Sequence, residues 1–219
     1  MNKKHLLGAA LLFSLAASTI TTHAHEAGDW IFRGGLTNVA PNDDSSNVFV
    51  AGADLGVGVS VGNNTQLGIN AAYMLTNNWA IELLAATPFS HDITLNTVGA
   101  LGETKPLPPT ISANYYFGSS DSKLKPYVGF GLNYTTFFSE EFTSANKDAG
   151  FSKLSLDDSF GLALQIGADY QINEQWHVNV SARRIDISTD ASFDLNGAQG
   201  KVSVDIDPSV YTFSLGYSF

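Results

Sequence analysis

The segment from Val210 to Phe219 constrains the fold of this chain more than any other stretch. A β-strand sends successive side chains to opposite faces, so a two-residue alternation predicts a strand with two unlike faces. Large apolar side chains take one face, and they are Tyr211, Phe213, Leu215, Tyr217 and Phe219. Small residues take the other face, and they are Thr212, Ser214, Gly216 and Ser218. The apolar face of such a strand must be covered by a protein core or by lipid.

The same alternation recurs in seven earlier segments, which makes eight predicted strands. The earlier strands are expected within residues 30–37, 66–73, 79–86, 111–117, 127–134, 159–170 and 176–183. After the last of these the pattern reverses, because Arg184 falls on the apolar side and Ile185 on the polar side. The reversal indicates either a β-bulge or the point where the strand leaves the lipid.

The connections between these strands alternate between short and long. Short ones are expected at residues 76–78, 118–125 and 173–175, and long ones at about 40–64, 88–108, 138–158 and 188–207. No apolar run after the first 24 residues approaches the roughly 20 residues that a membrane-spanning helix needs. Unequal connections of this kind are typical of outer-membrane barrels. We therefore predict an all-β fold, an eight-stranded antiparallel transmembrane β-barrel with short periplasmic turns and long extracellular loops.

The first 24 residues have the layout of a secretory signal peptide. Lys3 and Lys4 precede an apolar run from Leu6 to Ala17, and small residues end at Ala24. Removal of residues 1–24 would leave one domain, residues 25–219, with a formal charge of −12 from nine basic and 21 acidic side chains. So acidic a domain is a poor partner for nucleic acid. The absence of cysteine excludes disulfides and thiolate metal sites.

Aromatic residues gather at the ends of strands that meet the short turns. We expect an aromatic belt of Trp30, Trp79, Trp176, Tyr170, Phe117, Tyr217 and Phe219 there, with Tyr73 beside it, and a second belt of Phe160, Tyr134 and Tyr211 at the other end. Amphipathic rings at one height are favoured at a membrane–water interface. A soluble β-sandwich would also alternate, but it has no reason to order its rings by height.

Several stretches resemble the OmpW family of bacterial outer-membrane proteins. They are residues 25–30, 63–68, 82–89, 107–110, 125–138 and 207–208, and their order spans the whole chain after the predicted signal peptide. The resemblance implies a narrow barrel in the Gram-negative outer membrane that passes small hydrophobic molecules, which enter from outside and leave through the barrel wall. The closing aromatic also resembles the last strand of such barrels, which implies that the outer-membrane assembly machinery acts on Phe219. This chain departs from the family most within residues 48–62, so the ligand is not carried over.

Four charged residues fall on the inward-facing parity of the predicted strands, and they are Arg33, Glu82, Asp169 and Arg183. The interior of an eight-stranded barrel is only wide enough for side chains or one small ligand, so these charges need partners. We predict that Arg33 pairs with Glu82 or Asp169 near the periplasmic end and closes the lumen as a gate. The alternative is an ion pair that fills the barrel without gating.

Above these charges the inward positions are small or apolar. They are Gly35, Ala72, Leu84, Ala86, Gly129, Gly131, Gly161, Ala163 and Ile185. A lumen lined in this way suits an apolar ligand, although small residues also let a narrow barrel close. The apolar stretch from Val48 to Val61 is a candidate outer entrance, because exposed apolar patches tend to mark interaction sites.

Other motifs give weaker signals. Ser90, His91 and Asp92 are adjacent, and adjacent residues on an extended chain point apart, which disfavours a catalytic triad. His25 and His177 are too isolated in the sequence to indicate a metal site, and residues 194–197 indicate a turn rather than a calcium loop.

The sequence therefore predicts an outer-membrane channel or carrier for small hydrophobic molecules that is not an enzyme and needs no cofactor. Its expected partners are outer-membrane lipids, a small hydrophobic ligand and the assembly machinery, but no nucleic acid. The alternative is a structural or receptor-like surface barrel with a packed lumen and no transport.

Overall fold

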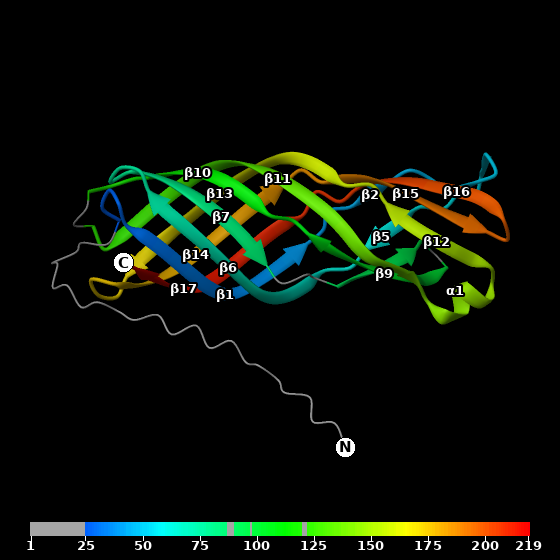
Figure 1. The fold of residues 1–219 in the computed structure, drawn as a ribbon, viewed down its shortest axis with the longest axis horizontal. Coiled ribbons are helices and arrows are strands. Elements are labelled where there is room, and N and C mark those ends of the chain that lie inside the picture. Colours follow the sequence, from blue (N-terminus) through cyan, green and yellow to red (C-terminus); the bar gives the residue numbers. More distant parts are fainter. Residues whose placement is uncertain (1–24, 87–89, 97, 120–121) are drawn as a thin grey trace, which may run out of the picture.

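The computed structural model describes residues 25–86, 90–96, 98–119 and 122–219. Its strands form a closed antiparallel barrel in the order β10-β7-β6-β1-β17-β14-β13-β11, and β11 pairs back to β10 (Figure 1). The eight strands are β1 (Trp30–Ala40), β6 (Asn64–Met74), β7 (Trp79–Ala86), β10 (Thr110–Tyr116), β11 (Leu124–Phe142), β13 (Ser159–Gln171), β14 (Trp176–Ile185) and β17 (Ser209–Ser218). The prediction of an eight-stranded barrel is confirmed. The predicted signal peptide, residues 1–24, lies outside the described residues.

The barrel closes between its first and last strands. β1 pairs with β17 in an unbroken register from Ile31 opposite Ser218 to Ala40 opposite Ser209. β1 pairs with β6 on its other side, so neither edge of β1 is left open.

In the half of the barrel near the short turns, which we call the lower barrel, most large apolar residues of the strands point outward. Leu36, Ile166 and Phe213 are about 60 % exposed, whereas Arg33, Glu82 and Asp169 are almost fully buried inside. A water-soluble fold would place these two groups the other way round. The outward face is therefore chemically suited to lipid tails.

The long connections are largely strands that lengthen the barrel on one side. They contain β2 (Asp44–Ser45), β3 (Phe49–Val50), β4 (Ala53–Asp54), β5 (Val59–Val61), β8 (His91–Leu95), β9 (Gly99–Leu107), β12 (Phe151–Leu156), β15 (Ser188–Leu195) and β16 (Ala198–Asp205), with the one-turn helix α1 (Ser144–Asp148). β5, β8 and β9 continue the barrel sheet beside the upper half of β11, and β12, β15, β16, β3 and β4 form a second sheet. We call these elements the extension, which occupies the right half of Figure 1.

The reversed pattern at Arg184 does not come from a bulge. β14 keeps a regular register with β13 and β17 through Arg184, which points outward, while Ile185 is buried inside. Ile185 packs with Phe137, Ile187 and Val210. The apolar side chains therefore move from the outer to the inner face of the wall because its surroundings change. Near the short turns the outer face of the wall contacts lipid, and toward the extension it contacts water.

The extension has its own apolar core. Val59, Ile93, Phe142, Phe193 and Val204 belong to one cluster of buried side chains there. None of the helices in the described part of the chain is long and apolar enough to span a membrane.

Candidate functional site

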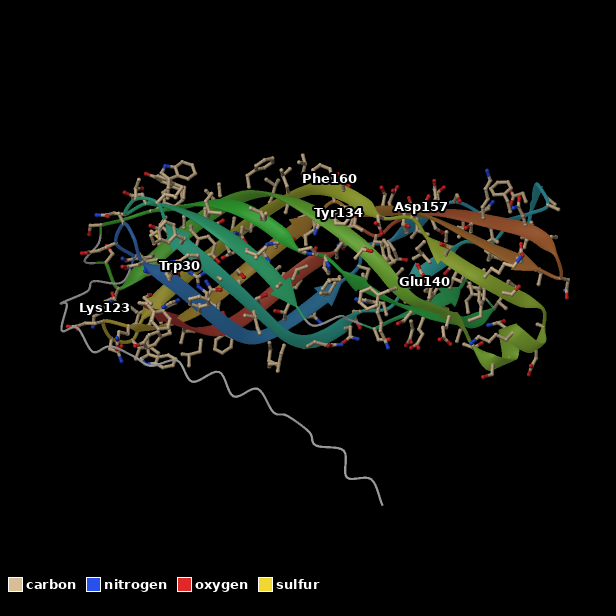
Figure 2. All side chains as sticks on the ribbon, viewed as in Figure 1. Trp30, Lys123, Tyr134, Glu140, Asp157 and Phe160 are labelled. Atoms are coloured by element: carbon tan, nitrogen blue, oxygen red, sulfur yellow. The ribbon has the colours of Figure 1, made fainter. Side chains whose placement is uncertain are left out.

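The aromatic residues at the short-turn end contact one another around the outside of the barrel. Trp30 and Tyr73 have ring centroids 5.0 Å apart, and the Trp176 and Tyr217 centroids are 4.9 Å apart. Phe219 lies 4.6 Å from the Tyr217 ring, again between centroids. The other expected belt residues, Trp79, Tyr170 and Phe117, are also exposed near this end. Figure 2 shows Trp30 at this end and Tyr134 with Phe160 near the middle of the long axis.

The band of outward-facing apolar side chains ends near the middle of the long axis, where the extension begins. Tyr134 and Phe160 point outward there, and beyond them the surface carries acidic side chains such as Asp157 and Glu140 (Figure 2). Tyr134 donates a hydrogen bond to Asp158, which ties a ring of the expected second belt to the polar extension. The band between the two groups of rings is the part of the wall that faces lipid.

Inside the lower barrel, Arg33 joins two carboxylates. One guanidinium nitrogen lies 2.6 Å from Asp169 Oδ2, and the other lies 3.2 Å from Glu82 Oε2. Arg33 also donates to the Tyr116 hydroxyl at 2.9 Å and to Asn70 Oδ1 at 3.4 Å. These groups come from five strands of the barrel, so their contacts cross its interior.

A second arginine completes the cluster. Arg183 Nη2 lies 2.7 Å from Glu82 Oε1, and it also donates to the side-chain oxygen of Gln165. Gln165 in turn donates to Glu82 and to Asn114. The structure therefore brings Arg33, Glu82, Asp169 and Arg183 into one network of two positive and two negative charges, which we call the lumen network.

The chain ahead of β1 contributes a residue that the sequence did not indicate. His25 is buried, and its Nε2 lies 2.7 Å from Asp169 Oδ2. Its ring is 5.5 Å from that of His177, so these two histidines, which are far apart in the sequence, lie close together in the fold. The fold unites them because the segment before β1 turns back under the barrel, where Gly28 N–H donates to the Met74 carbonyl oxygen. No group of three potential ligands able to hold a metal occurs among the described residues.

Most of the space beside the expected lining positions is occupied. A Cβ atom added at Gly129 would lie 2.1 Å from Asn114 Oδ1, and one at Gly161 would lie 1.9 Å from the Asp186 carbonyl oxygen. Gly35 and Gly131 lie equally close to neighbouring strands. These glycines allow close approach of other groups rather than leaving a void. Ala72, Leu84 and Ala163 are buried inside the barrel, and the side chain of Ala86 lies outside the described residues.

A cavity of about 90 Å³ lies above this packed region, within the extension. Its wall is almost wholly apolar, and its residues include Val48, Val50, Leu55, Val59, Val61, Ile93, Leu95, Phe137, Phe142, Phe151, Ile187, Phe193 and Ile206. An apolar cavity of this order stays dry and can accept a small apolar molecule. Five of these residues come from the stretch 48–61, which we expected at an outer entrance.

Sequence reasoning missed most of this cavity. Ile93, Phe142 and Phe193 come from three segments that were predicted as loops, and only the folded extension brings them together. The only local signal was the apolar character of residues 48–61.

Prolines remove N–H donors from the barrel wall beside the cavity. β7 pairs with β10 at Leu84 opposite Thr110, and β8 pairs with β9 at His91 opposite Thr104. Pro106, Pro108 and Pro109 lie between these pairs, and proline has no N–H to donate. Pro106 and Pro108 also line the cavity. We call this part of the wall the proline seam.

The adjacent Ser90, His91 and Asp92 do not assemble into a triad. Ser90 donates to Glu103 at 3.2 Å, whereas His91 Nδ1 lies 2.5 Å from the Gly62 carbonyl oxygen. Burial lowers the pKa of His91, although the hydrogen bond to Gly62 and the charge of Asp92 oppose this effect. Residues 194–197 form the β15–β16 hairpin turn as predicted, with positive φ at Asn196 and Gly197.

Comparison with known proteins agrees with this architecture. The family model described as OmpW family matches residues 26–219. Outer membrane protein W of Escherichia coli is 48 % identical over 94 % of this chain and 98 % of that protein. The crystal structure of the outer membrane protein OprG from Pseudomonas aeruginosa matches with a TM-score of 0.87 and 43 % identity, over 90 % of this chain and 99 % of that one.

A more distant relative carries a descriptive name. It is the dibenzothiophene metabolism operon protein PahQ of Pseudomonas aeruginosa, 28 % identical over 95 % of both chains. Family match, relatives and fold agree over nearly the entire length of residues 26–219. The chain therefore belongs to the OmpW family and is a protein of the outer membrane.

Proposed function

We propose that this protein passes small hydrophobic molecules from the outside into the outer membrane. The observation that carries the proposal is the apolar cavity of the extension, which lies beyond the lipid-facing band. Such a molecule is poorly soluble in water, and a dry apolar cavity on its path offers it a favourable site. No chemical reaction and no cofactor is required.

We propose that the lumen network is a gate that blocks a straight path into the periplasm. Arg33, Glu82, Asp169 and Arg183 are at most 4 % exposed and contact one another across the barrel. An apolar molecule that entered this layer would have to separate buried charges, which is strongly unfavourable. The lumen network thus favours an exit through the barrel wall between this network and the extension.

The proline seam is the exit that we propose. It borders the cavity through Pro106 and Pro108, and these two residues and Pro109 have no N–H group with which to hold the wall together. A stretch of wall held by fewer hydrogen bonds separates at lower cost than a paired one. A molecule that leaves here would pass directly into the lipid.

The name of PahQ supports the same class of ligand. Dibenzothiophene is an apolar aromatic compound, and PahQ is named for its metabolism operon. For the present chain we propose only the class, a small hydrophobic molecule.

Uptake by lipid vesicles tests the proposal. Vesicles that contain the protein should take up an apolar fluorescent tracer faster than protein-free vesicles. Ala191→Phe should reduce this uptake, because Ala191 lines the cavity and a larger side chain would fill it. Ser203→Phe, on the exposed face of β16, is the matched control. Equal uptake with and without protein would refute transport and favour a surface barrel with a packed lumen.

The exit is tested separately. Pro106→Val with Pro108→Val supplies two N–H donors to the seam and should slow tracer uptake while the barrel remains folded. Pro41→Val is the control, because Pro41 lines the same cavity but lies outside the seam. A straight route through the lumen predicts no difference between the two variants.

We also propose that Phe219 serves assembly. It directly follows β17, the strand that closes the barrel, and its ring is exposed and packs on Tyr217. Deletion of Phe219 should lower the amount of folded protein in the outer membrane. Phe213→Leu, on the same face of β17, should leave this amount unchanged.

A further inference from the structure

Thr104 places an unpartnered polar atom on the wall of the apolar cavity. It lies in β9, lines the cavity and is 3 % exposed. Its hydroxyl oxygen is buried and has no hydrogen-bond partner. Buried polar groups are nearly always paired, so this hydroxyl requires an explanation.

The other polar groups on the wall are engaged by the protein. Thr135 donates to Asn133 Oδ1 at 2.7 Å, and Thr189 donates to the Asp157 carbonyl oxygen at 2.7 Å. His91, directly opposite Thr104 in the β8–β9 register, directs Nδ1 to the Gly62 carbonyl oxygen. Thr104 is thus the threonine of this wall whose hydroxyl remains available.

We propose that Thr104 anchors the ligand by a hydrogen bond, and that the preferred ligand is a small apolar molecule with one uncharged oxygen group. A threonine hydroxyl both donates and accepts, so an alcohol, a phenol or a ketone would satisfy it. A plain hydrocarbon would leave the hydroxyl unpaired. This inference rests on the proposed function and names the ligand class for the same cavity.

The wall also selects against a charged oxygen group. Its described lining contains no lysine or arginine. A carboxylate in this cavity would therefore lose its hydration without gaining a countercharge, which is strongly unfavourable. His91 supplies no positive charge at neutral pH, since burial lowers its pKa. Organic acids in their ionised form are therefore excluded.

Paired probes that differ in one group test the anchor. The intact protein in detergent should bind phenol about fivefold more tightly than benzene, which is the order of one net hydrogen bond. It should bind benzoate more weakly than either. Thr104→Val should abolish the preference for phenol with little effect on benzene, and Thr104→Ser should restore it. Thr189→Val, which removes an engaged hydroxyl from the same wall, should keep the preference.

Each outcome separates the anchor from transport. An equal ratio of affinities in the native protein and Thr104→Val would overturn the anchor, as expected if water alone satisfies the hydroxyl. Uptake of both probes into vesicles is measured in parallel. Normal uptake with an unchanged ratio refutes only the anchor, whereas a Thr104-dependent ratio without protein-dependent uptake refutes only transport.

Discussion

The ion pair between Arg33 and Asp169 should be strongly coupled. The two groups are 2.6 Å apart and at most 1 % exposed. At an effective dielectric constant of about 20, opposite charges at this distance attract by about 6 kcal/mol, from which desolvation subtracts. Removal of one partner from a buried pair costs about 3–5 kcal/mol, because the other charge remains buried alone.

A double-mutant cycle measures this coupling. Arg33→Met and Asp169→Asn should each lower the free energy of unfolding by about 3–5 kcal/mol, and the double variant should lose about 2–3 kcal/mol less than their sum. Urea unfolding in lipid vesicles, followed by the fluorescence of the three tryptophans, gives these values.

An exposed pair of the same length provides the control. Lys153 Nζ and Asp194 Oδ2 are also 2.6 Å apart, but Lys153 is largely exposed. Water screens such a pair, so a cycle of Lys153→Met and Asp194→Asn should show no measurable coupling. Additive losses for Arg33 and Asp169, or equal coupling in both cycles, would show that burial does not strengthen the pair and would refute the reasoning.

Three further predictions follow from the geometry. Arg33→Ala should raise single-channel conductance in planar bilayers if the lumen network is a gate, and unchanged conductance would contradict gating. Gly216→Ala should destabilise the barrel by about 1–3 kcal/mol in urea unfolding, because the added Cβ would lie 2.0 Å from His177 Nε2. Acid should loosen the extension, because the pKa of His91 is lowered in the folded state. The contribution of His91 to the stability of the fold is therefore complete above about pH 6.5 and is lost as the pH falls below that value. Protease digestion of the extension should therefore be faster at pH 5 than at pH 7.5, and less so in His91→Asn, which keeps a donor for the Gly62 carbonyl oxygen.

The sequence predicted the lipid-facing barrel well because lipid imposes a strict rule on it. Every strand in the band must show apolar side chains outside, so the alternation at residues 159–170 or 210–219 is strong and continuous. Strand ends were less accurate. β11 runs to Phe142, eight residues past its predicted end, because above the band its outer face contacts water.

The extension was harder to predict for the same reason. Its strands face water outside and the apolar core inside, which inverts the pattern of the band. In β15 the inward residues Thr189, Ala191 and Phe193 alternate with polar outward residues, but the segment has no face of large apolar side chains like those of the lipid-facing strands, so it was interpreted as a loop. Its cavity depends on contacts between connections that are far apart in the sequence, and the local spacing of residues does not predict such contacts.

The candidate site was predicted in part. Arg33 and Glu82 were recognisable because a charge on the inward parity of a strand stands out among small residues. His25 precedes the first strand, so the alternation of strand residues does not indicate whether its side chain points into the barrel. Thr104 is one of many threonines in the chain, and only its burial without a partner distinguishes it.

The pairing of β1 with β17 has a consequence for biogenesis. These two strands are about 180 residues apart in sequence, and the cylinder is not sealed until they meet. Until then two open edges are available to any other unpaired strand, a state that invites aggregation. Joining such remote segments also carries a large loop-closure entropy, which makes folding slow. A barrel of this kind must therefore be kept apart from other copies before it folds, and the pairing of β1 with β17 is the last step that closes it.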